Sequence, residues 1–325
     1  MAKTVTLRED SDMLSVVVPA YNEQEMVALA GQTISDILAS EDIEHEIIFV
    51  DDGSADSTWK EIVDASEKNN SIRGVSFSRN FGKEAAILAG LRVSRGDCCA
   101  VIDCDLQHPP EKIVEMYRLW QEGYEVVEGV KSDRGSESAF RKFCASAFYK
   151  LMGGVMKTGM ENSSDFKLLD RKVVDTLLSM GERKTFFRAL SHWVGYNTAQ
   201  VEFEVRERAA GESKWSFKSL TGYAVSNLTS FSTAPIEFIT AAGAVMFIFS
   251  IIYGLVSLCR KLFGHADIGS ASTVFSVFFV GSVIVICLGT IGHYVARIYE
   301  EVKGRPRYII SKSCGDAVND KKTIR

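Results

Sequence analysis

Several sequence patterns that would indicate a common class of protein are missing from this chain of 325 residues. No Gly-x-Gly-x-x-Gly follows the first apolar segment, which argues against a nicotinamide-dependent dehydrogenase, and no Gly-x4-Gly-Lys-Ser/Thr loop indicates a P-loop nucleotide hydrolase. The seven cysteines include no Cys-x-x-Cys pair, so they predict neither a zinc site nor a disulfide framework. We therefore expect the catalytic part of the chain to face a reducing cytosol.

The chain also lacks a strong net charge. Its formal charge is −5, and no basic block with interleaved aromatic residues is present, so we expect no nucleic-acid partner. By contrast, 46% of the residues are hydrophobic and the mean hydropathy is +0.03, which is high for a wholly soluble chain. Part of the chain is therefore expected to lie in a membrane. Residues 1–12 lack the apolar core of a signal peptide, and we expect a disordered lead-in there.

The sequence VIDCDLQHPPE, residues 101–111, predicts a cation site at the end of a strand. Because side chains alternate along an extended segment, Asp103 and Asp105 point the same way and Cys104 points to the other side. Mg²⁺ binds one or two carboxylates together with the phosphates of a substrate, so a diphosphate ligand is expected, and Gln107 offers a further oxygen. The alternative is a solvated turn, which is the usual setting of two neighbouring aspartates.

Apolar segments alternate with helical patterns over residues 14–130, which predicts a doubly wound, mostly parallel α/β sheet. In open sheets of this kind, ligands bind beyond the carboxyl ends of the strands. The expected strands are residues 14–20, 46–50, 72–77, the run ending before Asp103, and 125–130.

Polar residues follow each of the first three expected strands. Tyr21 and Glu23 follow the first, and Asp52 follows the second; each group could bind a nucleoside or simply cap the next helix. Lys83 lies in a glycine-containing loop after the third strand, at the start of a helix, where it could meet phosphate or remain a solvated lysine.

Further polar residues lie after the sheet. Residues 163–166 are expected to form a loop near the cleft that includes Asp165, or an N-cap for the next helix. Residues 200–207 alternate as a half-exposed strand does. Basic and hydroxyl residues that could grip phosphate oxygens, or be solvated, are Lys131, Arg134, Arg141, Arg208, Ser213 and Lys214.

The C-terminal third predicts attachment to a membrane. Residues 238–258 and 274–292 carry no charge and are each long enough to span a bilayer core of about 30 Å. Residues 216–233 are expected to form an amphipathic helix, either in the membrane interface or in a core. More basic residues follow the second span than lie between the spans, which places both termini in the cytoplasm. The expected parts are a catalytic domain (13–215), the interfacial helix (216–233), a two-span region (234–296) and a basic tail (297–325).

Taken in order, VVVPAYNE, VDDGSADST, SFSRNFGKEAA, DCDLQHPPE, SSDFKLLDR and RAAGESKW resemble the family 2 glycosyltransferases that act on polyprenyl phosphates. The chain looks most like bactoprenol (undecaprenyl-phosphate) glucosyltransferases and, more distantly, dolichyl-phosphate mannose synthase, over essentially its whole length. The resemblance implies a GT-A nucleotide-sugar domain. It further implies that Pro19, Tyr21, Glu23 and Asp52 hold the nucleoside, that Asp103, Asp105 and Gln107 hold metal and diphosphate, that Asp165, Arg208, Ser213 and Lys214 border the sugar and acceptor, and that Lys131, Arg134 and Arg141 are weaker candidates for the lipid phosphate.

These expectations combine into one function and its rivals. The expected reaction is inverting and uses Mg²⁺ or Mn²⁺; it moves a hexose, glucose in the first instance, from a UDP-sugar to undecaprenyl phosphate at the cytoplasmic membrane face. Asp105, Asp165, Arg208 and Lys214 are the expected catalytic residues. A relative using GDP-mannose or a UDP-aminosugar would share every motif. A processive polysaccharide synthase would carry Gln-x-x-Arg-Trp, which is absent, and a non-catalytic nucleotide binder would be expected to lose the metal-binding acids. The sequence leaves the sugar, the metal and self-association open.

Overall fold

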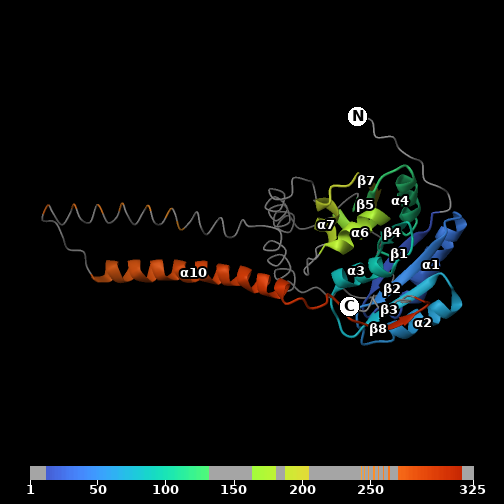
Figure 1. The fold of residues 1–325 in the computed structure, drawn as a ribbon, viewed down its shortest axis with the longest axis horizontal. Coiled ribbons are helices and arrows are strands. Elements are labelled where there is room, and N and C mark those ends of the chain that lie inside the picture. Colours follow the sequence, from blue (N-terminus) through green and yellow to red (C-terminus); the bar gives the residue numbers. More distant parts are fainter. Residues whose placement is uncertain are drawn as a thin grey trace. The chain divides into compact units, whose positions relative to one another are not determined.

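A computed structural model describes residues 12–131, 163–180, 187–204 and 270–316, together with separate residues between 243 and 263 (Figure 1). The described residues up to 204 and those from 305 onward belong to one compact unit, and those between 243 and 304 belong to a second. We describe each unit by itself.

The first unit is built on one eight-stranded sheet, with the strand order β7-β5-β6-β4-β1-β2-β3-β8. Its strands are β1 (Leu14–Ala20), β2 (His45–Asp51), β3 (Ile72–Phe77), β4 (Cys98–Val101), β5 (Val126–Lys131), β6 (Ser163–Asp170), β7 (Thr198–Phe203) and β8 (Ile310–Cys314). The helices of this unit are α1 (Val27–Ser40), α2 (Thr58–Lys68), α3 (Lys83–Val93), α4 (Lys112–Gln121), α6 (Arg171–Ser179) and α7 (Phe187–Trp193).

The parallel centre of the sheet agrees with the sequence prediction. β1 pairs in parallel with both β2 and β4, and β2 pairs in parallel with β3. These strands are almost wholly buried, which explains why they read as continuous apolar runs. Because all four run the same way, the polar loops that follow them meet at one edge of the sheet.

The prediction of a loop at residues 163–166 was wrong, because these residues begin β6, which lies antiparallel between β4 and β5. The strand escaped notice because Ser164, Asp165 and Lys167 are polar, although all three are buried. The helix cap also differs from the expected one: Asp170, not Asp165, accepts from the backbone N–H of Lys172 at the start of α6. β7 covers Thr198–Phe203 and so begins two residues before the expected strand of residues 200–207, of which residues 205–207 lie outside the described residues.

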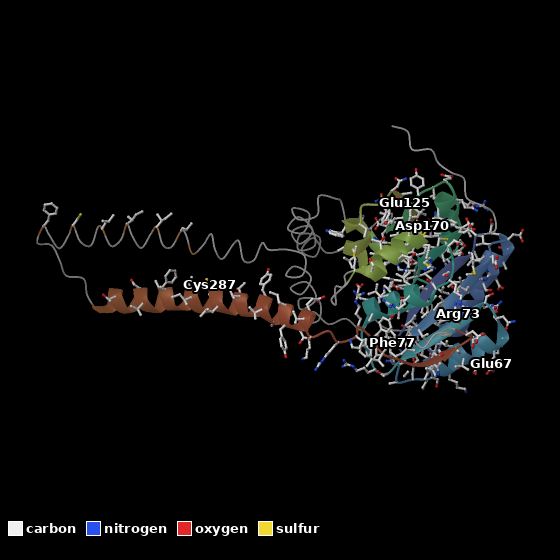
Figure 2. All side chains as sticks on the ribbon, viewed as in Figure 1. Glu67, Arg73, Phe77, Glu125, Asp170 and Cys287 are labelled. Carbon is white, nitrogen blue, oxygen red and sulfur yellow. The ribbon has the colours of Figure 1, made fainter. Side chains whose placement is uncertain are left out.

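The last described strand, β8, lies beside β3 and is coloured red in Figure 1. It is antiparallel to β3, with Gly74 opposite Cys314. Just ahead of it, Tyr308 stacks on Phe77, with ring centroids 5.1 Å apart; Phe77 and Arg73 of β3 are labelled in Figure 2. The guanidinium groups of Arg73 and Arg95 both donate to the backbone carbonyl of Asp316, two residues after the end of β8. A segment expected only as a basic tail therefore contributes the edge strand of the catalytic sheet.

In the second unit, α10 (Ser270–Val302) contains the second expected span. Among the described residues, it is the one helix long and apolar enough to cross a membrane, over Phe279–Val302. Many of the apolar side chains that are described in this helix are exposed, among them Val277, Ile286 and Leu288. The expected interfacial helix lies outside the described residues, and so does the first span apart from its separately described positions.

Candidate active site

The two aspartates of the DCD motif lie in a turn just beyond β4. Cys104 between them is buried in the core, while Asp103 and Asp105 are partly exposed, so the predicted alternation of faces is confirmed. Burial raises the pKa of the Cys104 thiol, and the charges of Glu23, Asp105 and Asp103 raise it further. Glu23 therefore lies close to this acidic turn, as expected for residues at the ends of neighbouring strands.

Lys83, the first residue of α3, links this turn to β6. Its Nζ lies 2.7 Å from Oδ1 of Asp103 and 2.9 Å from Oδ2 of Asp165. Burial alone would lower the pKa of Lys83, but the charges of Asp103 and Asp165 outweigh it and hold the pKa above the usual range of a lysine. Lys83 is therefore a cation paired with two carboxylates, although its side chain remains 42% exposed.

Asp165 is held by a second cation that sequence reasoning missed. Lys167 of β6 is opposite Val101 of β4, so Asp165, two residues earlier, lies alongside Asp103. Arg188 of α7 donates from Nε to Oδ1 of Asp165 at 2.6 Å and from Nη2 to Oδ2 at 3.0 Å. Burial would raise the pKa of Asp165, but Lys83 and Arg188 outweigh it and hold the pKa well below the usual range. Asp165 therefore stays ionised, with both oxygens engaged.

Asp52 accepts hydrogen bonds from the loop that precedes Lys83. Its Oδ1 accepts from the backbone N–H of Phe81 at 2.7 Å and its Oδ2 from that of Gly82 at 2.9 Å. Gly82 has a φ of 99°, a left-handed conformation that favours glycine, and Lys83 follows directly. Burial raises the pKa of Asp52 although these two N–H groups oppose the shift. Asp52 does not cap α2, where Asp56 instead accepts from the first backbone N–H of the helix.

The loops after β1 and β2 are joined to each other. Oδ1 of Asn22 accepts from the backbone N–H of Ala55 at 2.9 Å, and the backbone N–H of Glu23 donates to Oγ1 of Thr58 at 2.8 Å. Tyr21 remains 41% exposed beside them, and Pro19 pairs with Val50 one step inside the edge. The nucleoside candidates therefore share one surface at the carboxyl edge of the sheet.

Two further groups next to the acids were not singled out from the sequence. His108 is buried against Phe166 and Phe203, with ring centroids 5.3 and 5.2 Å away, and its Nδ1 lies 3.9 Å from Oδ2 of Asp103. Burial lowers the pKa of His108, and the charge of Asp103 opposes this shift. Lys131, the last residue of β5, pairs with Phe203 of β7. Glu84, next to Lys83, accepts from the backbone N–H that opens α7 at 2.9 Å. Burial and the charge of Asp165 raise its pKa to about 7.

The pattern of Glycosyl transferase family 2 matches residues 15–178, which run from the second residue of β1 to the end of β6 and most of α6. An uncharacterized glycosyltransferase of Synechocystis is 38% identical over 304 residues, which cover 93% of this chain and 96% of that protein. The chain belongs to glycosyl transferase family 2. The SfII prophage-derived bactoprenol glucosyl transferase of Shigella flexneri is also 38% identical, over 92% of this chain and 98% of its own length. The prophage bactoprenol glucosyl transferase homolog of Escherichia coli K12 is 37% identical over the same share of each.

This chain is thus a glycosyltransferase, and its acidic turn is suited to a divalent cation. Among the described residues, no three His, Cys, Asp or Glu side chains come together as a complete metal site. Asp103 and Asp105 instead supply carboxylates from one exposed turn, and a Mg²⁺ ion bound this way takes its remaining ligands from substrate phosphates and water. The donor set therefore fits a cation that arrives with a diphosphate.

The structure brings together the glycosyltransferase residues Glu23, Asp103, Asp105, Asp165 and Lys83. Arg188 escaped sequence reasoning because a lone charge in a helix carries no motif, whereas Glu84 and His108 stood inside quoted motifs and still had no assigned role. Five expected site residues lie outside the described residues: Arg134, Arg141, Arg208, Ser213 and Lys214.

Proposed function

We propose that this glycosyltransferase moves glucose from UDP-glucose to undecaprenyl phosphate. Two relatives that align over almost their whole length are named for bactoprenol glucosyl transfer, which supports the sugar and the acceptor. The observation that carries the chemistry is the cluster of Asp103, Asp165 and Lys83 at the carboxyl edge of the sheet, where α/β folds bind ligands.

On the donor side, Asp103, Asp105 and Gln107 would hold Mg²⁺ or Mn²⁺ together with the diphosphate, and the metal would stabilise the charge that develops on the leaving group. Tyr21 is 41% exposed, and we assign it to the nucleoside together with Pro19, Glu23 and Asp52. The ammonium group of Lys83 lies beside the acidic turn and supplies a further positive charge for the diphosphate.

On the acceptor side, no general base is needed. A phosphate monoester has its second pKa near 6, so at neutral pH it already presents an oxyanion that the protein only has to desolvate and aim. We assign the aiming to Arg208, Ser213 and Lys214, with Lys131, Arg134 and Arg141 as further phosphate contacts.

The reaction is expected to invert the anomeric centre. Asp165 is the buried carboxylate that would otherwise serve as a nucleophile, but both of its oxygens are bound by Lys83 and Arg188. A carboxylate stabilised in this way attacks poorly, which favours one in-line displacement. α-Linked UDP-glucose would then give a β-linked glucosyl phosphoryl lipid.

We further propose that the chain crosses the membrane twice, with the catalytic domain and both termini in the cytoplasm. The apolar exposed surface of α10 supports one of these spans. Labelling of cysteines placed at Gly269 and Lys312, in intact cells with an impermeant reagent, should mark the first position alone. Labelling at Lys312, which lies in the catalytic sheet, would contradict the orientation.

The deciding experiment incubates the purified full chain with a panel of radiolabelled nucleotide sugars and a short-chain prenyl phosphate. We expect transfer from UDP-glucose to exceed transfer from GDP-mannose and from UDP-aminosugars. Proton NMR of the product should show a β anomeric coupling. An α coupling would contradict single displacement, and preference for another donor would replace glucose in the proposal.

A further inference from the structure

Beside the site lies a buried polar cluster that the reaction steps above do not use. Lys167 of β6 stands directly opposite Glu128 of β5, and their ammonium and carboxylate groups form an ion pair. Nζ of Lys167 also donates to Oγ of Ser191 at 2.7 Å, and Nε2 of His192 lies 3.0 Å from Oε1 of Glu128. We refer to Glu128, Lys167, Ser191 and His192 as the buried charge network.

The network joins the helix and the strand that also carry the site contacts. Asp165 and Lys167 are two residues apart on β6 and therefore face the same side of the sheet. Arg188, Ser191 and His192 stand at positions i, i+3 and i+4 of α7 and therefore share one face of that helix. That face meets the strands in one set of contacts, with Arg188 on Asp165 and the other two residues within the network.

Burying an ion pair between a helix and a sheet carries a large desolvation penalty. The side chains of Lys167 and Glu128 are 0% and 1% exposed. Burial alone would raise the pKa of Glu128, but His192 and Lys167 outweigh it and lower the pKa to about 2, so the carboxylate stays charged. Apolar residues of similar volume commonly stabilise a fold as well as a buried ion pair does, or better. We therefore attribute to these charges a role in positioning α7 rather than in stabilising the fold.

Placement matters because α7 has seven residues and carries the arginine that binds Asp165. A slip of one residue turns a helix by about 100° and shifts it by about 1.5 Å, which would remove Arg188 from Asp165. Asp165 in turn holds Lys83 against Asp103. An error in the register of α7 would therefore reach the acidic turn through two ion pairs.

We propose that the buried charge network positions the active site: it fixes α7 in the one register that sets Arg188 on Asp165. Its members are positioning residues and touch neither substrate. The inference rests on the proposed function for the reaction that it serves, but its physical content, the register of α7, is independent of the sugar and the acceptor.

The first test removes both charges together, because loss of one would leave the other buried and unpaired. The paired variant Glu128→Leu/Lys167→Met should melt within a few degrees of the wild type or above it. Hydrogen exchange followed by mass spectrometry should show amides of α7 exchanging about tenfold faster, with those of β1 and β2 unchanged. Unchanged exchange in α7, or failure of the variant to fold, would overturn the proposal.

The second test is kinetic. The paired variant should lower kcat by roughly 30-fold, because the displaced Asp165 and Lys83 no longer stabilise the leaving diphosphate in the transition state. The KM for the donor should stay within about threefold, because the residues that we assign to the nucleoside follow β1 and β2. In an Arg188→Ala background, the same two changes should lower kcat no further, since they act through Arg188. An undiminished loss in that background would show that the network acts by another route and would sink the inference.

The matched control is Lys112→Gln/Glu115→Gln, which removes an ion pair of 2.7 Å from the exposed surface of α4. It should change neither exchange in α7 nor kcat. If the wild type itself fails to use UDP-glucose with a prenyl phosphate, the proposed function falls, and the exchange measurement still decides the register of α7.

Discussion

The two halves of the catalytic sheet are built from different materials. In β4, β1, β2 and β3, the buried charged residues lie near the strand ends: Glu46 and Arg73 pair at the second positions of β2 and β3, and Asp51, the last residue of β2, accepts from Ser76. In β6 and β5, the charges of Asp165, Lys167 and Glu128 lie at or near the edge that carries the site.

This difference indicates a division of labour. The parallel half is an apolar platform, and the ends of its strands present the residues that we assign to the donor. Its stability should depend on the volume of its core side chains rather than on charges there. The half formed by β5 and β6, which we call the mixed half, positions its charged side chains by pairing them. Its function should therefore suffer when a charge is removed, even where the new side chain has the same volume. The predictions below test this contrast, from the largest expected effect to the smallest.

The largest effect is expected where the platform ends. Asp103→Asn and Asp105→Asn should each lower the transfer rate by roughly 1000-fold, because the leaving diphosphate loses the metal that absorbs its charge. EDTA should abolish transfer, and added Mg²⁺ or Mn²⁺ should restore it. Initial rates with UDP-glucose and a prenyl phosphate measure both effects; full activity in chelator would contradict the metal assignment.

Asp165→Asn tests the mixed half. The change leaves Lys83 and Arg188 without the carboxylate between them, so kcat should fall by roughly 100-fold while UDP binding changes little. Titration calorimetry with UDP, beside steady-state kinetics, separates the two effects. Asp97→Asn is the control, at an exposed carboxylate that accepts from the backbone N–H of Met13, just before β1. A loss confined to UDP affinity would move Asp165 to the donor side.

Gly90→Ala tests the volume of the parallel half. A Cβ at Gly90 of α3 would lie 2.2 Å from Cγ1 of Val17 on β1, a stiff branched side chain. We expect a loss of about 1–2 kcal/mol in the free energy of unfolding, since overpacking outweighs the gain in helix propensity. Gly31→Ala, where the nearest atom is the flexible end of Ile72 at 3.0 Å, should be close to neutral. Equal effects in urea denaturation would contradict the contrast.

The smallest effect concerns Glu84, which joins α3 to α7. Its pKa is raised from 4.5 in the unfolded chain to about 7 in the folded one, so the folded state favours the protonated form. The stability that this proton contributes is complete below about pH 4.5 and is lost as the pH rises through about 7. Glu84→Gln should therefore gain about 1 kcal/mol in the free energy of unfolding relative to the wild type between pH 6 and pH 8. Parallel melting curves over that range would show that Glu84 titrates normally.

How much of this protein the sequence determined differs between the two halves. The strands β1 to β4 and the helices between them follow from apolar runs and helical periodicity, because a strand buried on both faces can be recognised without its partners. The acidic turn was likewise predictable: an alternation of two carboxylates around a buried cysteine is a local property. Membership of the family followed from motifs in order.

The elements that could be recognised only in the tertiary structure are those whose sequence signals are not local. β6 was not recognised because its polar residues are buried by pairing with β5 and α7. β8 was not recognised because this short segment of five residues becomes a strand only by pairing with β3. Arg188 carries no motif at all and becomes a site residue through a contact 23 positions away along the chain. Periodicity reports which faces are apolar, whereas the partner of a buried charge is fixed by folding, and in this chain those partners shape the surroundings of Asp165.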